Sequence, residues 1–142
     1  MRARSKARGW ALQVLYAWES RGLEASPQAV LHAFEEERQI SDESRAYLRT
    51  LVKHVAEHRD ELDRQLEHAL TNWRLDRLAV IDRNILRLAA AEMMYENDVP
   101  PAVSIQEAIV LAEKYGTNES PRFVNGVLDA LRKSIESNSG AS

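Results

Sequence analysis

The sequence predicts an all-helical protein, and three observations lead to that prediction. Every apolar segment repeats at intervals of three and four residues, the spacing that places side chains on one face of a helix. No segment shows the alternation of apolar and polar residues that marks a half-buried strand. Several segments begin with a capping serine followed by proline or an acidic residue, as helices do. At 142 residues and 44% hydrophobic content, the chain is long enough to form a core of its own.

The expected helices follow one another along the chain with short segments between them. In chain order they lie at about residues 4–20, from Ser26-Pro27 onward, from Ser41 onward, over residues 62–70, over about residues 79–96, from a capping box at residues 104–107 to residue 116, and from Ser120 onward. No linker is long enough to separate two domains, so we expect one domain over residues 1–133. The polar residues 134–142 are expected to form a disordered tail.

The last of these helices has an unusual sequence. Its Asn125-Gly126 pair normally marks a turn, yet apolar residues recur at helical spacing across it. We interpret Gly126 as a close-packing position against a neighbouring helix, the alternative being a place where an outside backbone or ligand approaches. Phe123 lies at the edge of the apolar stripe and follows Arg122, so its ring is placed to stack on a molecule that arrives from outside.

Positive charge is concentrated at the N-terminus. Arg2, Arg4, Lys6 and Arg8 precede the first acidic residue, Glu19, and removing these four from the 19 basic residues leaves 15 against 22 acidic ones. A basic segment on an acidic body indicates an anionic partner, with nucleic acid as the first candidate. The alternative is a solvated, frayed terminus that binds nothing.

Two features raise the question of catalysis. Glu92 falls on the apolar face of the 79–96 helix, where we expect it to accept hydrogen bonds from backbone N–H groups; the alternative is a catalytic acid. His54, Glu57 and His58 match the H-x-x-E-H pattern of zinc peptidases, but their helical phase directs them to water. With no cysteine and no nucleotide-binding or nucleophile-elbow motif, we expect no enzyme activity, no metal and no other cofactor.

The composition also bears on location. No apolar run is long enough to span a bilayer, so no membrane partner is expected. The absence of cysteine fits a reducing cytoplasm, where we expect the protein to act.

Motifs spread along the whole chain form a recognisable set. They are Arg8, Gln13 to Trp18, Asn72-Trp73, Arg77-Leu78, Asp82, Ile85 to Ala89, Glu92, Pro100, Val103, Ile105, Glu107-Ala108, Leu111-Ala112, Tyr115-Gly116 and, most specifically, Phe123 to Asp129. Taken together, they resemble the motifs of the NusB family of bacterial transcription antitermination factors. The resemblance extends from about residue 4 to residue 131. It implies about seven helices in two small bundles and a non-enzymatic role. That role is to bind the boxA element of nascent ribosomal RNA with the ribosomal small-subunit protein NusE, and to join the antitermination complex on RNA polymerase.

The resemblance also implies which residues make the contacts. Its RNA-binding positions correspond to Arg4, Lys6 and Arg8 in the basic segment and to Glu119, Ser120, Arg122 and Phe123 at the last helix. Its NusE-facing positions correspond to Tyr16, Asp76 and Asp82. The basic residues here alternate with alanine and serine, where relatives have a contiguous arginine run, so weaker phosphate binding is expected. Cations on phosphates and an aromatic ring on a splayed base are what single-stranded RNA requires. A protein–protein adaptor with an incidental basic segment is the competing class.

Overall fold

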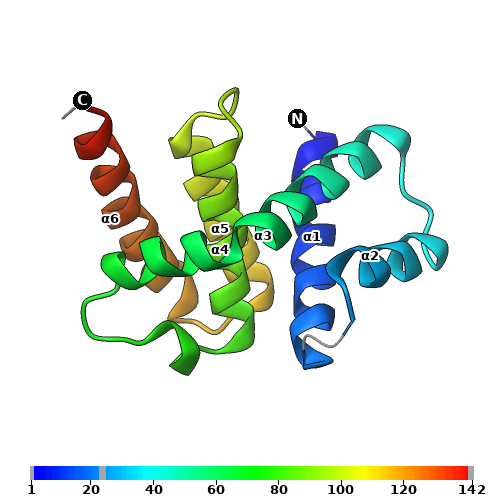
Figure 1. The fold of residues 1–142 in the computed structure, drawn as a ribbon, viewed down its shortest axis with the longest axis horizontal. Coiled ribbons are helices and arrows are strands. Elements are labelled where there is room, and N and C mark those ends of the chain that lie inside the picture. The colour runs from blue at the N-terminus through cyan, green and yellow to red at the C-terminus, as the bar shows by residue number, and fades with distance from the viewer. Residues whose placement is uncertain (1, 23–24, 141–142) are drawn as a thin grey trace.

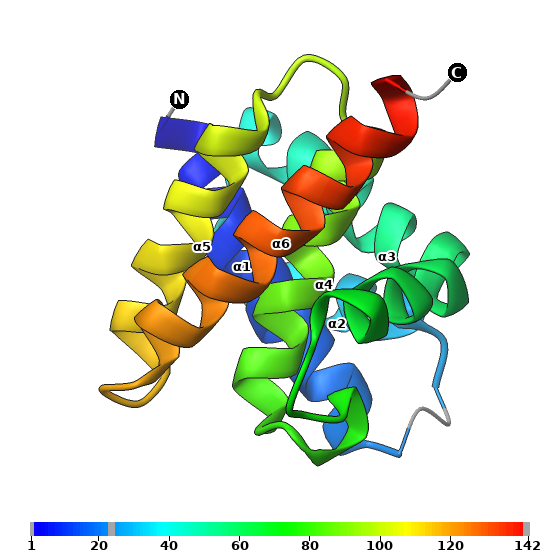
Figure 2. The same ribbon diagram turned by 90° about the vertical axis from the view of Figure 1, so that its left-hand side faces the viewer.

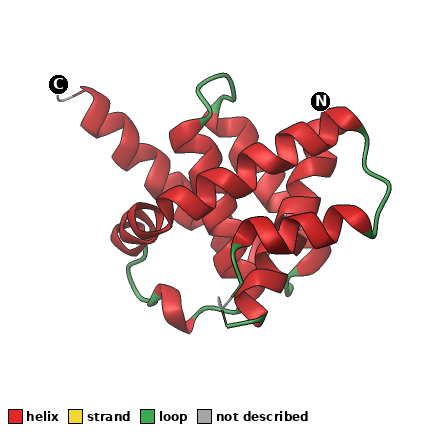
Figure 3. Ribbon diagram, turned by 45° about the vertical axis from the view of Figure 1, so that its right-hand side comes forward, coloured by secondary structure: helices red, strands yellow, loops and turns green. Residues whose placement is uncertain are grey.

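Helices account for nearly all of the chain in the computed structural model, which describes residues 2–22 and 25–140. Within those ranges there are six α-helices, one short 3₁₀ helix and no strand (Figure 3). In order they are α1 (Arg2–Ser20), α2 (Pro27–Glu36), α3 (Asp42–Ala69), η1 (Leu75–Arg77), α4 (Val80–Tyr95), α5 (Pro101–Tyr115) and α6 (Ser120–Gly140). The all-helical prediction is confirmed.

The long helix α3 joins two groups of helices. Figure 1 shows α1 and α2 at one end of the molecule, α4, α5 and α6 toward the other, and α3 crossing both groups. The backbone of His58 is non-helical (φ −120°, ψ 19°) and bends α3 in its middle. The two separate helices that the sequence predicts here meet at this kink, and counting them as the single element α3 gives six α-helices in place of about seven. A single hydrophobic core runs through both groups.

The starts of the helices follow the expected capping chemistry in two cases and depart from it in a third. Ser26 Oγ accepts from the Ala29 N–H at 3.0 Å, and Ser41 Oγ accepts from the Ser44 N–H at 3.2 Å. The predicted capping box at residues 104–107 is wrong, because α5 already begins at Pro101. Proline loses nothing at a first helical position, so the helix starts a turn earlier than the box.

Helices α5 and α6 pack side by side and meet through a tight loop (Figure 2). Ser120 was expected to cap α6, but it is the first residue of that helix, and its Oγ turns back to accept from the Thr117 N–H at 3.0 Å. A Cβ on Gly116 would lie 2.5 Å from that Oγ, so only glycine fits beside it. The loop that precedes Phe123 is thus held by a close approach between Gly116 and Ser120.

Helix α6 is longer than the sequence analysis predicts. It continues to Gly140, through most of the segment expected to be a disordered tail, while residues 141 and 142 lie outside the described residues. Its last turns are supported by the ion pairs Arg132–Glu136 (3.2 Å) and Lys133–Asp129 (3.1 Å) at helical spacing. Among the described helices, none is long and apolar enough to cross a membrane.

Candidate nucleic-acid interface

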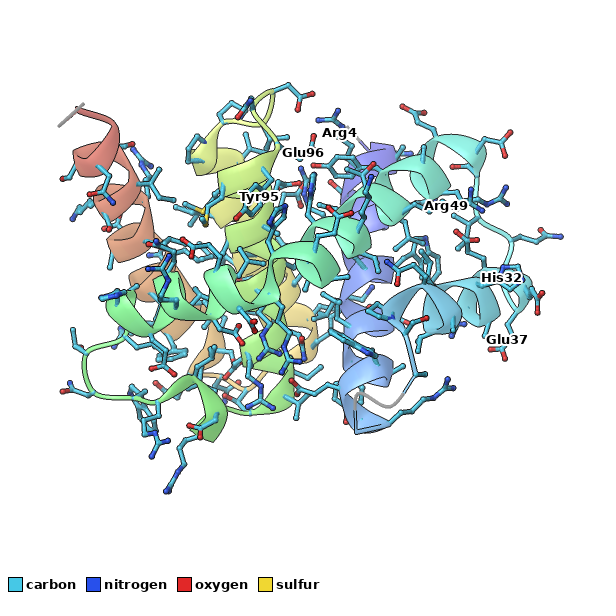
Figure 4. All side chains as sticks on the ribbon, in the orientation of Figure 1. Arg4, His32, Glu37, Arg49, Tyr95 and Glu96 are labelled. Carbon is cyan, nitrogen blue, oxygen red and sulfur yellow. The ribbon has the colours of Figure 1, made fainter. Side chains whose placement is uncertain are left out.

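The positively charged segment predicted as an arm is the first part of α1, which is helical from Arg2 onward. Arg4 forms an ion pair with Asp98 at 2.9 Å and lies 4.5 Å above the ring of Tyr47. Figure 4 shows Arg4 at the same end of the molecule as Glu96. The segment is therefore a helix fixed against its neighbours, and the frayed-terminus alternative does not describe it.

Arg8 lies inside the protein, where it pairs with Glu92. It is 6% exposed; its Nε donates to both carboxylate oxygens of Glu92 at 2.9 and 3.1 Å, and its Nη1 donates to Glu107 at 2.9 Å. The hydroxyl groups of Tyr47 and Ser104 also donate to Glu92, the latter at 2.7 Å. Burial and the hydrogen bond to Glu92 raise the pKa of Tyr47 above its usual value. We call this cluster the Glu92 junction.

The Glu92 junction corrects two sequence-based interpretations. Glu92 is a buried structural acceptor, as expected, but its donors are side chains of three other helices rather than backbone N–H groups. Arg8, expected to contact RNA, is enclosed and paired with the carboxylates of Glu92 and Glu107, so it is not available to RNA in this structure. Of the three α1 cations predicted to bind RNA, Arg4 and Arg8 form ion pairs, whereas Lys6 is exposed and forms none within the described residues. Arg2, one turn earlier in α1, is also exposed.

A hollow of about 480 Å³ lies between the segment that follows α3 and the start of α6. Its aromatic walls are Trp73, which is 59% exposed, and Phe123; their ring centroids are 6.2 Å apart and the rings are nearly perpendicular. Arg77 and Arg122 also line it, and both are exposed. We call this feature the Trp73–Phe123 hollow.

The segment that carries Trp73 is fixed by arginine side chains from α4. Arg83 donates to the carbonyl oxygens of Leu75 and Leu78 at 3.2 and 2.9 Å and pairs with Glu19 at 2.5 Å. Arg87 also donates to Glu19, at 2.7 Å. Burial acts to raise the pKa of Glu19, but the hydrogen bonds from the two arginines outweigh it and leave that pKa below its usual value. One wall of the hollow is thereby tied to α1 and α4.

All four RNA-binding positions predicted near α6 line the Trp73–Phe123 hollow: Glu119, Ser120, Arg122 and Phe123. Ser120 is 1% exposed and its hydroxyl is bonded within the loop, so it shapes the hollow instead of projecting into it. Asp82, predicted to face NusE, lines the same hollow from the first turn of α4. Its Oδ1 is buried and has no hydrogen-bond partner among the described residues.

The sequence and the fold both match those of known proteins. The model of the NusB family matches residues 5–133 of the chain. The chain belongs to the NusB family. Its relatives include the transcription antitermination protein NusB of Sorangium cellulosum (45% identity, covering 95% of each chain), that of Trichlorobacter lovleyi (44%, covering 92% of this chain and 91% of the relative) and that of Bacillus subtilis (43%, 94% and 97%).

Solved NusB structures share the fold. A chain from the crystal structure of antitermination factors NusB and NusE in complex with double-stranded RNA superposes with a TM-score of 0.85 at 33% identity, covering 94% of this chain and 98% of that one. NusB of T. maritima superposes with a TM-score of 0.82 at 34% identity, covering 92% and 90%. A chain from the crystal structure of a plectonemic RNA supercoil gives 0.86 at 34% identity, covering 95% and 97%. The NusB-type helical fold predicted from the motifs is confirmed.

The three residues that the NusB resemblance assigns to NusE do not share one surface feature. Tyr16, 43% exposed, lines a hollow of about 450 Å³ between α1 and α2, and Asp76 lines a third hollow beside Glu19. The consecutive residues Ile81 and Asp82 near the start of α4 line different hollows, Ile81 that of Tyr16 and Asp82 the Trp73–Phe123 hollow.

The two histidines of the H-x-x-E-H motif make packing and hydrogen-bond contacts with α4 and the residue after it. His58 stacks on Tyr95 at 3.9 Å between ring centroids, and His54 Nε2 lies 2.7 Å from Glu96. Both histidines are half-buried, so the expectation that they face water is wrong; Glu57 is exposed. The described residues contain no cluster of three side chains able to hold a metal ion.

Two features of the site were not foreseen. Gly126 is exposed and a Cβ there would meet nothing within 4 Å, so the close-packing interpretation is wrong and its surface is open to solvent. Trp73 was noted only as part of the family resemblance, although a tryptophan in a polar segment between helices is itself a signal for a binding surface. Its contact with Phe123 could not be read from the sequence, because residues distant in the chain form it.

Proposed function

We propose that this protein is a cytoplasmic transcription antitermination factor that binds boxA-type single-stranded RNA together with NusE and joins the antitermination complex of RNA polymerase. The observation that carries the proposal is the Trp73–Phe123 hollow, where the exposed ring of Trp73, the half-buried ring of Phe123 and two exposed arginines line one space. Aromatic rings stack on splayed bases and arginines hold phosphates, which is the combination that single-stranded RNA needs. The role is binding rather than catalysis.

The cations proposed for phosphate contact differ in their exposure and in whether a carboxylate of the protein already pairs with them. Lys6 and Arg122 are exposed and carry no ion pair among the described residues. Arg4 is paired with Asp98, whose side chain is 61% exposed. Exposed ion pairs are worth about 0–1 kcal/mol, so Arg4 exchanges a carboxylate for a phosphate at little cost. Arg8 is left out of the proposed surface because the Glu92 junction encloses it.

For NusE we propose the surface around Tyr16. This residue projects from α1 with almost half of its side chain in solvent, beside an apolar hollow that reaches Phe34 and Ile81. Tyrosine suits an interface that is apolar at one side and wet at the other. The relative solved with both NusE and RNA supports two partners binding to one such chain. Neighbouring residues of α4 line the two hollows, which supports NusE and RNA surfaces that lie on the same part of the protein.

A direct test is an anisotropy titration with labelled boxA-type RNA, with and without NusE and at several salt concentrations. We expect binding that weakens steeply with salt, tightens when NusE is present, and is stronger than binding to a scrambled RNA of equal length. Duplex RNA of the same sequence serves as the comparison, since the relative was solved with double-stranded RNA. RNA binding that does not respond to salt, or none at all, would favour the adaptor class instead.

A further inference from the structure

The packing of Trp73 does not by itself fix the position of its ring. The side chain is 59% exposed, and the ring meets Phe123 edge-on with 6.2 Å between the ring centroids. Trp73 lies in the irregular stretch between Leu70, the C-cap of α3, and η1. An exposed ring in an irregular segment has few buried contacts to hold it, so its position depends on how the segment itself is anchored.

The segment is anchored at Leu75, two residues after Trp73. The Leu75 side chain is 4% exposed, and its N–H donates to Glu67 Oε1 at 3.0 Å. Its carbonyl oxygen accepts from Arg83 Nη1 at 3.2 Å. The same nitrogen of Arg83 donates to the carbonyl of Leu78, the residue after η1, at 2.9 Å. One side chain of α4 therefore holds both ends of this turn.

Arg83 is in turn held by Glu19 of α1. Its Nε and Nη2 donate to the two carboxylate oxygens of Glu19 at 3.1 and 2.5 Å, and the Arg83 side chain is only 12% exposed. The planar guanidinium, whose donors have a fixed geometry, can serve a carboxylate and two carbonyl oxygens at once. All three side-chain nitrogens of Arg83 already donate to the protein, so this arginine is not placed to bind a phosphate.

We propose that Arg83 is a positioning residue for RNA binding, which holds the segment of Trp73 so that the ring is in place beside Phe123 before a base arrives. The inference rests on the proposed RNA-binding function and adds to it a residue that acts through Trp73 without touching RNA. A ring that is already in place stacks on a base without the entropic cost of being ordered. For one side chain that cost corresponds to roughly 2- to 12-fold in affinity.

The test compares Arg83→Met and Trp73→Ala, singly and together, in anisotropy titrations with boxA-type RNA. Arg83→Met should remain folded, because Glu19 keeps Arg87 as a donor at 2.7 Å and the Leu75 carbonyl keeps the Leu78 N–H at 3.2 Å. We expect Arg83→Met alone to weaken RNA binding by roughly 2- to 12-fold and to leave its salt dependence unchanged. Added to Trp73→Ala, the same change should cause no further loss, because the residue through which Arg83 acts is already gone.

Two further variants separate positioning from the loss of an arginine. Arg49→Met is the matched control: Arg49 pairs with Glu35 at 2.8 Å between α3 and α2, at the end of the molecule that carries α2 (Figure 4), and RNA affinity should be unchanged. Arg83→Lys keeps a positive charge for Glu19 and donors for the carbonyls, so it should recover most of the affinity.

The free protein offers a readout that does not depend on RNA. In NMR spectra without RNA, the indole N–H signal of Trp73 should move in Arg83→Met and return toward its original place in Arg83→Lys. The signal of Trp10, which packs on Phe34, serves as the reference that stays in place.

The results that would overturn the inference are distinct from those that end the proposed function. A loss of RNA affinity by Arg83→Met that is equally large in the Trp73→Ala protein would overturn it, and a reduced salt slope would then identify Arg83 as a phosphate contact. An unmoved Trp73 signal, or normal RNA affinity in folded Arg83→Met protein, would overturn it as well. If the unaltered protein binds no RNA, the proposed function ends, and the Trp73 signal alone decides whether Arg83 holds the segment. Thermal melts establish folding; if Arg83→Met melts too low for titration, Arg83→Gln replaces it with the same expectations.

Discussion

Two carboxylates near opposite ends of α4 are in contrasting situations. Glu92 is buried in the Glu92 junction, where an arginine, a tyrosine and a serine from three other helices donate to it. Asp82 lies at the edge of the Trp73–Phe123 hollow, and its buried Oδ1 has no donor within the described residues. The first carboxylate joins helices; the second lines a hollow and has one oxygen without a donor.

The comparison shows that charge alone does not mark a binding residue. Arg8 belongs to the most basic part of the sequence, yet its charge is used inside the protein. Arg77 and Arg122 lie outside that basic part of the sequence, yet both are exposed and line the Trp73–Phe123 hollow. Whether a charged side chain already has partners in the fold decides whether it is offered to RNA.

The largest expected effect is at the Glu92 junction. Glu92→Ala should lower the free energy of unfolding by about 3–5 kcal/mol. It removes the buried partner of the Arg8 cation, which keeps only Glu107, and leaves the hydroxyl groups of Tyr47 and Ser104 without their acceptor. Urea denaturation measures this, with Glu113→Ala as the control at an exposed glutamate. The paired replacement of Arg8→Met with Glu92→Leu should recover much of the loss. A loss below about 1 kcal/mol in Glu92→Ala, within the range of an exposed pair, would contradict the account.

The next largest effect is expected on the affinity for RNA at the Trp73–Phe123 hollow, rather than on the stability of the fold. Phe123→Ala should weaken binding of boxA-type RNA by about 1–3 kcal/mol through the loss of a stacked base, and should leave the salt dependence unchanged. Tyr95→Ala is a matched control, because Tyr95 is also a half-buried aromatic residue but stacks on His58. Thermal melts of both variants separate binding from stability. Normal RNA affinity in folded Phe123→Ala protein would make Phe123 a core residue only.

A smaller effect is expected on the free energy of unfolding at high pH. The folded protein holds the Tyr47 proton more tightly than the unfolded chain does, because burial and Glu92 raise the pKa of this tyrosine above 10.0. The unfolded chain therefore releases a proton as the pH rises past 10.0, and the contribution of Tyr47 falls by up to about 1.4 kcal/mol per pH unit.

Tyr47→Phe should remove that part of the pH dependence when stability is measured between pH 9 and 11, a range of about two units around the usual tyrosine pKa. Tyr16→Phe, at an exposed tyrosine, should retain it. Parallel curves for the Tyr47 variant and the unaltered protein would show that the phenol does not belong to the junction as described.

The smallest effect concerns single cations of α1. Lys6→Gln should reduce the salt slope of RNA binding by about 0.7, the value for one phosphate contact on a single strand. Lys53→Gln, an exposed lysine on α3, should leave the slope unchanged. If Lys6→Gln has no effect, α1 makes no phosphate contact at this position, and the proposed RNA surface is confined to the hollow.

Much of the fold could be predicted because periodic apolar positions and caps are local. The helix starts at Ser26-Pro27 and Ser41 follow from a few neighbouring residues, as does the position of the most apolar helix. The apolar pattern separates the helix that begins at Ser41 from the one over residues 62–70, but it does not locate the bend at His58, whose ring stacks on Tyr95 of another helix. The length of α6 was missed because a polar composition resembles a disordered tail.

The candidate site was predictable only in part. The helical spacing around Phe123 places that residue at the edge of the core, and the structure agrees, with Phe123 half-buried in the hollow. The exclusion of Arg8 could not be foreseen, because its partners Glu92 and Glu107 are far along the chain. The unpaired oxygen of Asp82 depends on the whole surroundings of the side chain, which no local pattern describes.

The most direct test of the central claim, that RNA meets the protein at the Trp73–Phe123 hollow, is an NMR titration of the unaltered protein with boxA-type RNA. The chain has three tryptophans, so three indole N–H signals report on three places. Trp18 donates its indole N–H to the Ala25 carbonyl at 2.9 Å, and Trp10 packs edge-to-face on Phe34. We predict that RNA shifts the Trp73 signal and leaves the signals of Trp10 and Trp18 in place. A Trp73 signal that stays unchanged at saturating RNA would contradict the account.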